Sequence, residues 1–183
     1  MYHEKQSLMR CGLHALNNLL QEPVFTSEDM TRASQSLLQL EGSINPTAGV
    51  LSYVPLLRDH YKKLSYEFPF GYGNYDVNVL VYILQGKGYT MKWIDSNAAA
   101  LMTDTAIGIL CNVVTKRWFS WKKLEQRHWF AIKQIKGVHY NLDSMLQEPE
   151  AFDLKEDLHQ FLMKLSDSQE CQFFRIERSS QHT

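Results

Sequence analysis

The spacing of apolar residues changes near Gly86, and this change constrains the fold of the 183-residue chain more than any other feature. Before that glycine, apolar residues recur at helical spacing. After it, short apolar runs and alternating patterns predict strands. A block of helices followed by a block of strands is typical of the α+β class. We therefore expect N-terminal helices packed on one antiparallel sheet.

The predicted elements follow this order. Helices are expected over residues 11–21, 27–66, 77–85 and 154–165, and the 27–66 segment is expected to form a helical hairpin arm that begins at a capping box. Strands are expected over 89–94, 106–112, 128–135, 138–142 and 171–176. Asn74 or Asp76 would cap the 77–85 helix, which is apolar nearly all round and therefore expected to be buried. One domain is expected over residues 1–178, with a frayed tail over 179–183.

Composition and charge exclude several classes of protein. The hydrophobic share is 44% and the aromatic share is 12%, which is enough for one packed core, and no apolar run approaches the length of a membrane span. The formal net charge is -1, so no global field attracts nucleic acid or an anionic membrane. A monomer without a nucleic-acid partner is expected.

The three cysteines, Cys11, Cys111 and Cys171, lie far apart in the sequence. Their odd number and wide spacing argue against a disulfide framework, and Cys11-x-x-His14 lacks the second ligand pair of a zinc site, so no metal or cofactor is expected. The first residues are charged and lack the apolar region of a signal peptide. A reducing compartment is expected: the cytoplasm, with the nucleus and the membrane periphery as further locations.

Cys11 is the strongest candidate for chemistry. It opens the first predicted helix, where unpaired backbone N–H groups and the positive end of the helix dipole favour a thiolate. Gln6 precedes it closely, and the Gln6 amide can donate a hydrogen bond to an oxyanion that forms beside the sulfur. The pair indicates the nucleophile half of a cysteine hydrolase, which needs a base from elsewhere in the chain.

Two of the seven histidines are candidates for that base. His14 shares a helical face with Cys11, but a helical side chain leans back over its own preceding turn, so we interpret His14 as a hydrogen-bonded, partly buried residue that supports the site. His128 begins a predicted strand and is the better candidate. The histidines expected at the surface are His3, His60, His159 and His182.

The connection between two predicted strands decides which residue orients His128. If Lys136-Gly137 is a two-residue turn, alternation places His128, Asn141 and Asp143 on one sheet face. Asp143 is then the diagonal neighbour of His128, roughly 7 to 8 Å away and within side-chain reach. A loop one residue longer would reverse this parity. The alternative interpretation is that Asn141 and Asp143 are polar simply because the strand ends there and the chain enters a turn.

Together these residues describe an acyl-transfer site. Cys11 would attack a carbonyl carbon, His128 would act first as base and then as acid, and Asp143 would fix the imidazole tautomer. Gln6 and the Cys11 backbone N–H would form the oxyanion hole. The order Gln, Cys, His, Asp is that of papain-like enzymes, although the local papain signature is absent.

Several blocks of the sequence resemble the Josephin family of cysteine deubiquitinases. They are His3-Glu4-Lys5-Gln6, Cys11-x-x-His14-x-x-Asn17-Asn18-Leu19-Leu20-Gln21, Gly73-Asn74-Tyr75-Asp76-Val77-Asn78-Val79, His128-Trp129 and Tyr140-Asn141-Leu142-Asp143-Ser144. The resemblance covers about residues 2–177. It is greatest to the small Josephins, which consist of the catalytic domain with little else.

This resemblance implies a papain-like domain that hydrolyses the bond between the C-terminus of ubiquitin and a lysine. Cys11, His128 and Asp143 match the family's nucleophile, base and orienting residue, and Gln6 matches its oxyanion residue. Some members have Asn where this chain has Asp143. Because some small Josephins are weak enzymes until modified, a ubiquitin-binding module with weak or modification-dependent catalysis is the alternative. A general papain-like peptidase is a third hypothesis.

Residues 116–123 match the family poorly and mix basic with aromatic side chains. Such a mix can bind single-stranded nucleic acid or a membrane surface. We favour a variable loop whose aromatic side chains pack on the core, because nothing else in the charge distribution supports a nucleic-acid partner.

Overall fold

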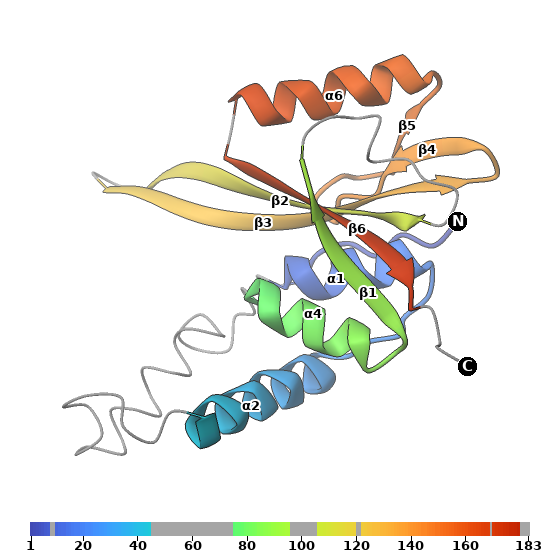
Figure 1. Cartoon of the computed structure of the whole chain (residues 1–183). Coiled ribbons are helices and arrows are strands. Elements are labelled where there is room, and N and C mark those ends of the chain that lie inside the picture. The colour runs from blue at the N-terminus through green and yellow to red at the C-terminus, as the bar shows by residue number, and fades with distance from the viewer. Residues whose placement is uncertain (8–9, 45–74, 96–105, 120–121, 169, 180–183) are drawn as a thin grey trace.

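The computed structural model describes residues 1–7, 10–44, 75–95, 106–119, 122–168 and 170–179. Its strands form one sheet in the order β1-β6-β2-β3-β4-β5, and every neighbouring pair is antiparallel (Figure 1). The strands are β1 (Tyr89–Ile94), β2 (Ala106–Phe119), β3 (Lys122–Ile135), β4 (Val138–Asn141), β5 (Glu150–Phe152) and β6 (Cys171–Arg178). The helices of the described residues are α1 (Cys11–Leu20), α2 (Ser27–Ile44), α4 (Val77–Gln85) and α6 (Lys155–Ser168).

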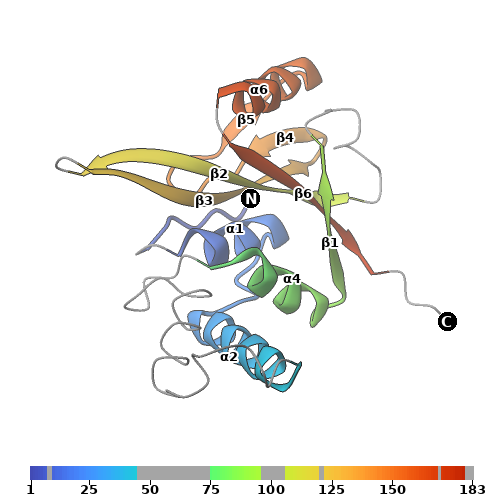
Figure 2. The ribbon, with the colours of Figure 1, turned by 60° about the vertical axis from the view of Figure 1, so that its left-hand side comes forward.

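The helices lie on both faces of the sheet. α1 packs against one face, α4 and α2 lie beyond it, and α6 covers the opposite face (Figure 2). Each face has its own hydrophobic core. The predicted α+β class, with helices packed on an antiparallel sheet, is therefore confirmed.

The strands differ from the prediction in two ways. Residues 116–119 and 122–123, which were predicted to lie in a variable loop, are strand instead, because β2 continues to Phe119, β3 begins at Lys122, and the two strands pair as far as those residues. The three-residue strand β5 was not predicted. α2 supplies the first part of the predicted arm, and residues 45–66 of that arm lie outside the described residues.

α1 is the central helix of the larger core. All its residues from Cys11 to Leu19 are buried, because the sheet covers one side and α4 covers another. Gly12 permits this close approach: a Cβ there would meet Leu80 Cδ1 at 3.4 Å and Trp129 Cδ1 at 3.6 Å. A larger residue at position 12 would therefore press against the layers on both sides of α1.

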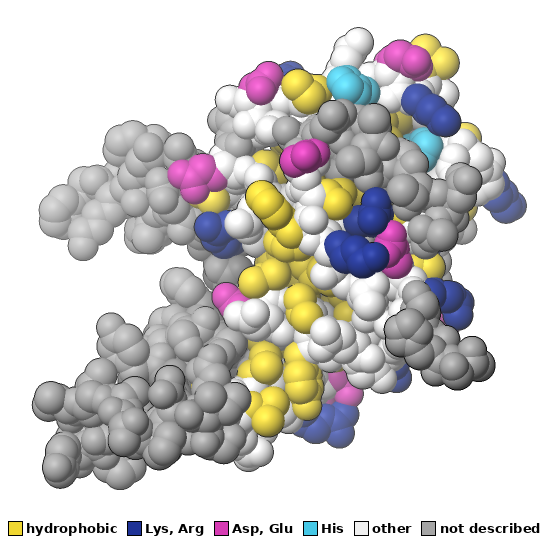
Figure 3. Space-filling model, in the orientation of Figure 1, with side chains coloured by type: hydrophobic (Ala, Val, Ile, Leu, Met, Phe, Trp, Pro, Cys, Tyr) yellow, Lys and Arg dark blue, Asp and Glu magenta, His cyan; other side chains and the backbone are white. Residues whose placement is uncertain are grey.

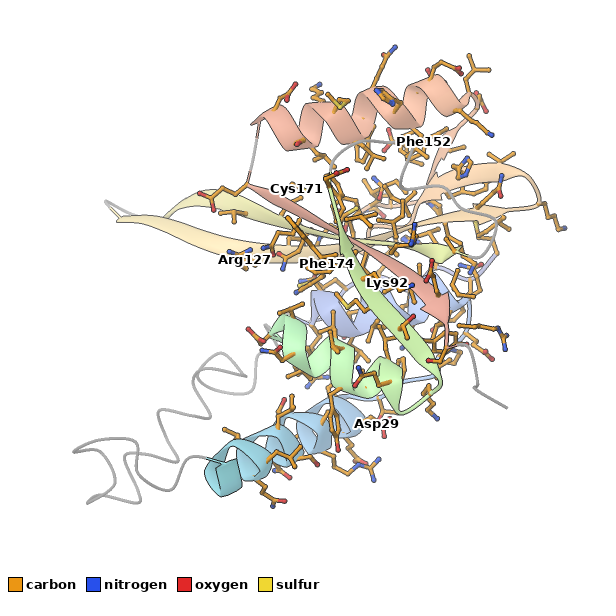
Figure 4. The ribbon with its side chains drawn as sticks, in the orientation of Figure 1. Asp29, Lys92, Arg127, Phe152, Cys171 and Phe174 are labelled. Atoms are coloured by element: carbon orange, nitrogen blue, oxygen red, sulfur yellow. The ribbon has the colours of Figure 1, made fainter. Side chains whose placement is uncertain are left out.

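The second core lies between the sheet and α6. Phe152 and Cys171 are on this side, whereas Phe174 is on the α1 side (Figure 4). The α6 side chains that enter this core include Leu158 and Leu162, which are spaced one helical turn apart and are buried. This core supports the face of β3 from which His128 projects.

α4 has the predicted bounds and the predicted Asp76 cap, whose carboxylate accepts a hydrogen bond from the backbone N–H of Asn78 at 2.8 Å. The expected burial on all sides is wrong. Val79, Leu80 and Leu84 are buried, but Tyr82 is 38% exposed. An apolar composition does not by itself bury a helix that lies at the edge of a layer.

Apolar side chains also reach the surface. Hydrophobic side chains form a band that crosses β1 and continues over the helices below the sheet (Figure 3). Large hydrophobic side chains that are exposed among the described residues include Trp93 of β1 at 69%, Leu40 of α2 at 49% and Tyr82 of α4. Among the helices described, none combines the length and the apolar run that crossing a bilayer requires.

The predicted capping box starts α2. Thr26 Oγ1 accepts a hydrogen bond from the Asp29 backbone N–H at 3.2 Å, and Asp29 Oδ2 accepts one from the Thr26 backbone N–H at 2.8 Å. Hydrogen bonds from the Thr26 side chain and backbone, and then from Arg32, lower the pKa of Asp29 to about 2. The two residues satisfy each other's backbone donors at the helix start.

We expect Thr26→Ala to lower the free energy of unfolding by about 1 kcal/mol, because the hydroxyl cap is lost. Urea denaturation measures this difference, and Thr26→Ser, which retains the hydroxyl, is the matched control. Since the Asp29 pKa is lowered from 3.8 to about 2, the contribution of its carboxylate is present above pH 3.8 and lost as the pH falls through about 2. Equal stability of the alanine and wild-type proteins at neutral pH would contradict the cap.

Candidate active site

Cys11 is the first residue of α1, and it is 4% exposed. Arg10 occupies the N-cap position with φ −97° and ψ 37°, and its side chain makes no capping hydrogen bond. The first turn also contains no acidic residue. The first N–H groups of an α-helix have no hydrogen-bond partner within the helix. The start of α1 therefore places backbone donors and the positive end of the helix dipole beside the Cys11 thiol. Both favour negative charge on the sulfur or on an oxygen next to it.

His128 and Asp143 form a hydrogen-bonded pair on the neighbouring strand and the segment that follows β4. His128 Nε2 lies 2.8 Å from Asp143 Oδ1, and the same oxygen accepts a hydrogen bond from the Met145 backbone N–H at 2.9 Å. Asn141 accepts a hydrogen bond from the Asp143 backbone N–H at 3.1 Å. The His128 side chain is 11% exposed, and its imidazole stacks on Phe130 with ring centroids 6.1 Å apart. Its orientation is therefore fixed on several sides.

The strand pairing explains why these groups meet. Ile135 pairs with Val138 across the turn, as expected for a two-residue connection, and Ile132 pairs with Asn141. His128 is even-numbered like Ile132, so both project from the face that Asn141 shares. The predicted register is confirmed, and Asp143 follows on the same side.

His128 and Cys11 interact electrostatically. Burial lowers the pKa of His128, but hydrogen bonds to Asp143 and Cys11, and the negative charges of both, raise the pKa from 6.5 to about 9. Asp143 occupies Nε2, which leaves Nδ1 of the imidazole for the sulfur. The interaction stabilises the folded protein below pH 6.5, and this contribution is lost as the pH rises through about 9.

The N-terminal segment carries Gln6 to the same place. The Gln6 backbone N–H donates to the Ser144 carbonyl at 2.9 Å, and His3 Nε2 donates to the Asp143 carbonyl at 3.0 Å. Asn18 of α1 donates to the Leu142 carbonyl at 3.1 Å. The predicted oxyanion residue thus lies directly against the segment that carries Asp143.

His14, the rival base, has both ring nitrogens engaged. Its Nδ1 lies 2.9 Å from Glu4 Oε1, and its Nε2 accepts a hydrogen bond from the Ser7 backbone N–H at 3.2 Å. Neither nitrogen is left to take a proton from Cys11. The geometry supports the interpretation of His14 as a buried, hydrogen-bonded residue beside the site.

The two other cysteines are poorly suited to nucleophilic chemistry. Burial, followed by the charges of Cys171 and Asp143, raises the pKa of Cys111 well above its usual range. Burial raises the pKa of Cys171 to about 12. Both thiols therefore stay protonated at neutral pH and remain poor nucleophiles.

Sequence reasoning gave no role to three residues that organise this region, Asn17, Asn18 and Gln21. With His14 they form a polar stripe along α1 and its C-cap, at the i, i+3, i+4 and i+7 spacing of one helical face. Buried amides need hydrogen-bond partners, so the adjacent Asn17 and Asn18 in an otherwise apolar helix were the available signal. Their partner is the N-terminal segment over residues 2–7.

An α+β fold with a cysteine at the start of a buried helix and a His–Asp pair beside it is typical of papain-like cysteine hydrolases. Comparison with family profiles makes this class more specific. The Josephin profile matches residues 6–176. The chain therefore belongs to the Josephin family, whose domain is papain-like.

Individual relatives agree with this assignment. A Josephin-like protein of Arabidopsis thaliana is 37% identical over 169 residues, which cover 88% of this chain and 43% of the relative. Josephin-2 of Homo sapiens is 33% identical over 166 residues, which cover 88% of this chain and 78% of the relative. An ataxin-3 homolog of Arabidopsis thaliana is 25% identical over 159 residues, which cover 82% of this chain and 50% of the relative. The match therefore spans less than half of the first of these relatives.

We expect His128 to titrate at about pH 9 in NMR spectra of its imidazole resonances. Asp143→Asn should lower this pKa, because the carboxylate charge is lost while burial still disfavours the imidazolium. His139 is an internal reference in the same spectra. Burial, and then the charge of Lys155, lowers the pKa of His139 below 6.5. Titration of wild-type His128 at or below pH 6.5 would contradict the charged pair.

Proposed function

We propose that this chain is a deubiquitinase that hydrolyses isopeptide and peptide bonds at the C-terminus of ubiquitin through a Cys11 thioester. The observation that carries the proposal is that His128 interacts with both Cys11 and Asp143 within a Josephin domain. Ubiquitin and ubiquitinated proteins are the proposed partners. The residues proposed for catalysis are Cys11, His128, Asp143 and Gln6.

The first half of the reaction would form the acyl-enzyme. His128 Nδ1 holds the proton that leaves Cys11, and the thiolate attacks the carbonyl carbon of the terminal glycine of ubiquitin. The carbonyl oxygen becomes an oxyanion, which the Gln6 amide and the Cys11 backbone N–H would stabilise. As the intermediate collapses, the C–N bond breaks and His128 gives its proton to the departing lysine amine.

The second half would release ubiquitin. His128, now neutral, takes a proton from water, and the resulting hydroxide attacks the thioester carbon. The C–S bond breaks, the ubiquitin carboxylic acid leaves and loses its proton to solvent, and the Cys11 thiolate recovers its pairing with the protonated His128. Asp143 accepts the hydrogen bond from Nε2 throughout, which keeps the imidazole in one tautomer and stabilises its charged form.

A fluorogenic substrate made from ubiquitin with a C-terminal leaving group tests this proposal. The wild-type protein should release the fluorophore, and Cys11→Ala should abolish release. Gln6→Ala should lower kcat by about 100- to 1,000-fold, the usual effect of losing one oxyanion donor. Full activity of Cys11→Ala would show that Cys11 is not the nucleophile.

The alternatives give different results in parallel assays. A ubiquitin-binding module would bind ubiquitin but would fail to form a covalent adduct with an electrophilic ubiquitin probe. A general papain-like peptidase would cleave short peptides with no preference for a ubiquitin tail. A panel of diubiquitins then separates the linkages that an active enzyme would accept.

Asp143 and Asn141 should differ in their effect on catalysis. We expect Asp143→Ala to lower kcat/KM by roughly 100-fold or more, because His128 loses its charged hydrogen-bond acceptor. Asn141→Ala should cost about tenfold or less, since among the described residues the Asn141 side chain hydrogen-bonds only to the Asp143 backbone N–H and the Glu150 carboxylate. Asp143→Asn keeps an acceptor oxygen and is the matched control. A larger effect at Asn141 would contradict the assignment of Asp143 as the orienting group.

A further inference from the structure

We propose that Glu4, acting through His14, is a positioning residue that fixes the N-terminal segment and with it the oxyanion donor Gln6. This inference rests on the proposed function, because it concerns how the hydrolase site is assembled. Glu4 touches neither the substrate nor the reacting atoms in this scheme. It sets the place of a residue that does.

The Glu4 carboxylate accepts hydrogen bonds from both the N-terminal segment and α1. Glu4 Oε1 lies 2.9 Å from His14 Nδ1 and accepts a hydrogen bond from Asn17 Nδ2 at 3.0 Å. Glu4 Oε2 accepts a hydrogen bond from the Tyr2 hydroxyl at 2.6 Å. The side chain of Glu4 is only 23% exposed, so these donors replace much of its hydration.

The backbone around Glu4 is bound to the same helix. The Glu4 N–H donates to Asn18 Oδ1 at 2.7 Å, and the Glu4 carbonyl accepts from Asn18 Nδ2 at 3.2 Å. Gln21 exchanges two hydrogen bonds with the backbone of Tyr2, each 3.0 Å long. Tyr2 therefore lies at the end of the polar stripe and Glu4 at its middle. The segment runs antiparallel to α1, toward Cys11.

His14 extends this row of contacts to the residue after Gln6. The Ser7 backbone N–H can only donate, so His14 Nε2 must be an acceptor and the ring proton must sit on Nδ1, where it is donated to Glu4. The carboxylate thus selects the tautomer that can hold Ser7. Without Glu4, the imidazole would lose the partner that fixes both its proton and its rotamer.

Gln6 is consequently held on three sides. Glu4 and Ser7 are bound to α1 before and after it in the chain, and its own N–H is bound to Ser144 beside Asp143. An oxyanion donor contributes only if it is already in place when charge develops. Loosening the segment would therefore impair the chemical step more than substrate binding.

The experiment compares kcat, KM and thiol reactivity with the ubiquitin fluorogenic substrate and iodoacetamide. We expect Glu4→Ala to lower kcat about 10- to 100-fold and to change KM less than about twofold, since only the transition-state contact is weakened. His14→Ala, which retains the other Glu4 contacts, should have a similar effect. Alkylation of Cys11 by iodoacetamide forms no oxyanion, so its rate should stay within about twofold of wild type in both variants.

Two further variants separate positioning from a general structural effect. Glu4→Gln keeps an oxygen that accepts from His14 and Asn17, and it should recover most of the kcat. Lys5→Ala is the matched control, because Lys5 lies in the same segment and its side chain makes an exposed contact with Gln147. Its kcat should equal that of wild type.

A double-mutant cycle with Gln6 is the decisive measurement. If Glu4 acts through Gln6, adding Glu4→Ala to Gln6→Ala should lower kcat by less than about twofold more. Additive losses, wild-type kcat in folded Glu4→Ala or His14→Ala, or a parallel fall in alkylation rate would each overturn the inference. Should Glu4→Ala fail to fold, His14→Ala decides by the same criteria. An inactive wild-type protein would instead refute the proposed function.

Discussion

The two-residue turn at Lys136 and Gly137 is the constraint on which the site depends. Both residues have positive φ, 51° and 87°, as a type I′ turn requires, and Gly137 adopts this conformation without the penalty of a Cβ. The turn pairs Ile135 with Val138, and this pairing fixes the parity of everything beyond it. One more residue in the turn would move Asp143 to the opposite face from His128. The hydrogen bond between them would then be impossible.

The charges of the site stabilise one another where each alone would be costly. Burial of His128 by itself disfavours the imidazolium, yet the Asp143 and Cys11 partners raise its pKa to about 9. The Asp143 oxygen that faces His128 is also hydrogen-bonded by Met145 N–H, so the carboxylate is not left desolvated without donors. The uncapped start of α1 adds positive potential beside Cys11. Removing one member would leave the others buried without compensation, which is why their effects should be strongly coupled.

The helix and strand bounds that depend on nearby residues were predicted correctly from the sequence. Val77–Gln85 and Tyr89–Ile94 have the predicted bounds, because a cap, a glycine stop and a clean change of periodicity mark them. The long pairing of β2 with β3 was not predicted, since its outer part has the composition of a basic and aromatic loop rather than a strand alternation. β5 has three residues and exists through its pairing with β4, which no local pattern records. Tertiary contacts decide both cases.

The contacts of the site also have two kinds of cause: some follow from local sequence signals and others from tertiary packing. The contact of His128 with Asp143 followed from a turn and a parity rule, both of which can be derived from the sequence. The contacts of Glu4 with His14 and Asn17 depend on how a segment without regular structure lies along a helix. Such a placement leaves only an indirect trace in the sequence, namely polar residues on a buried helix.

The polar residues on α1 also explain how the helix and the sheet come together at one site. The polar stripe of α1 binds residues 2–7, so the same helix positions both Cys11 and the segment that carries Gln6. The sheet positions the other two residues, because the turn and β4 place Asp143 beside His128. The helix and the sheet parts of the site are joined by hydrogen bonds to three successive carbonyls: Asn18 to Leu142, His3 to Asp143, and Gln6 to Ser144. Two of these donors, His3 and the Gln6 N–H, belong to the N-terminal segment, so a shift of that segment by one residue would break both of their bonds, while Asn18 would keep α1 joined to Leu142. Hydrogen bonds to one short stretch of backbone thus hold Gln6 and the α1 helix of Cys11 against the segment that carries Asp143, the partner of His128.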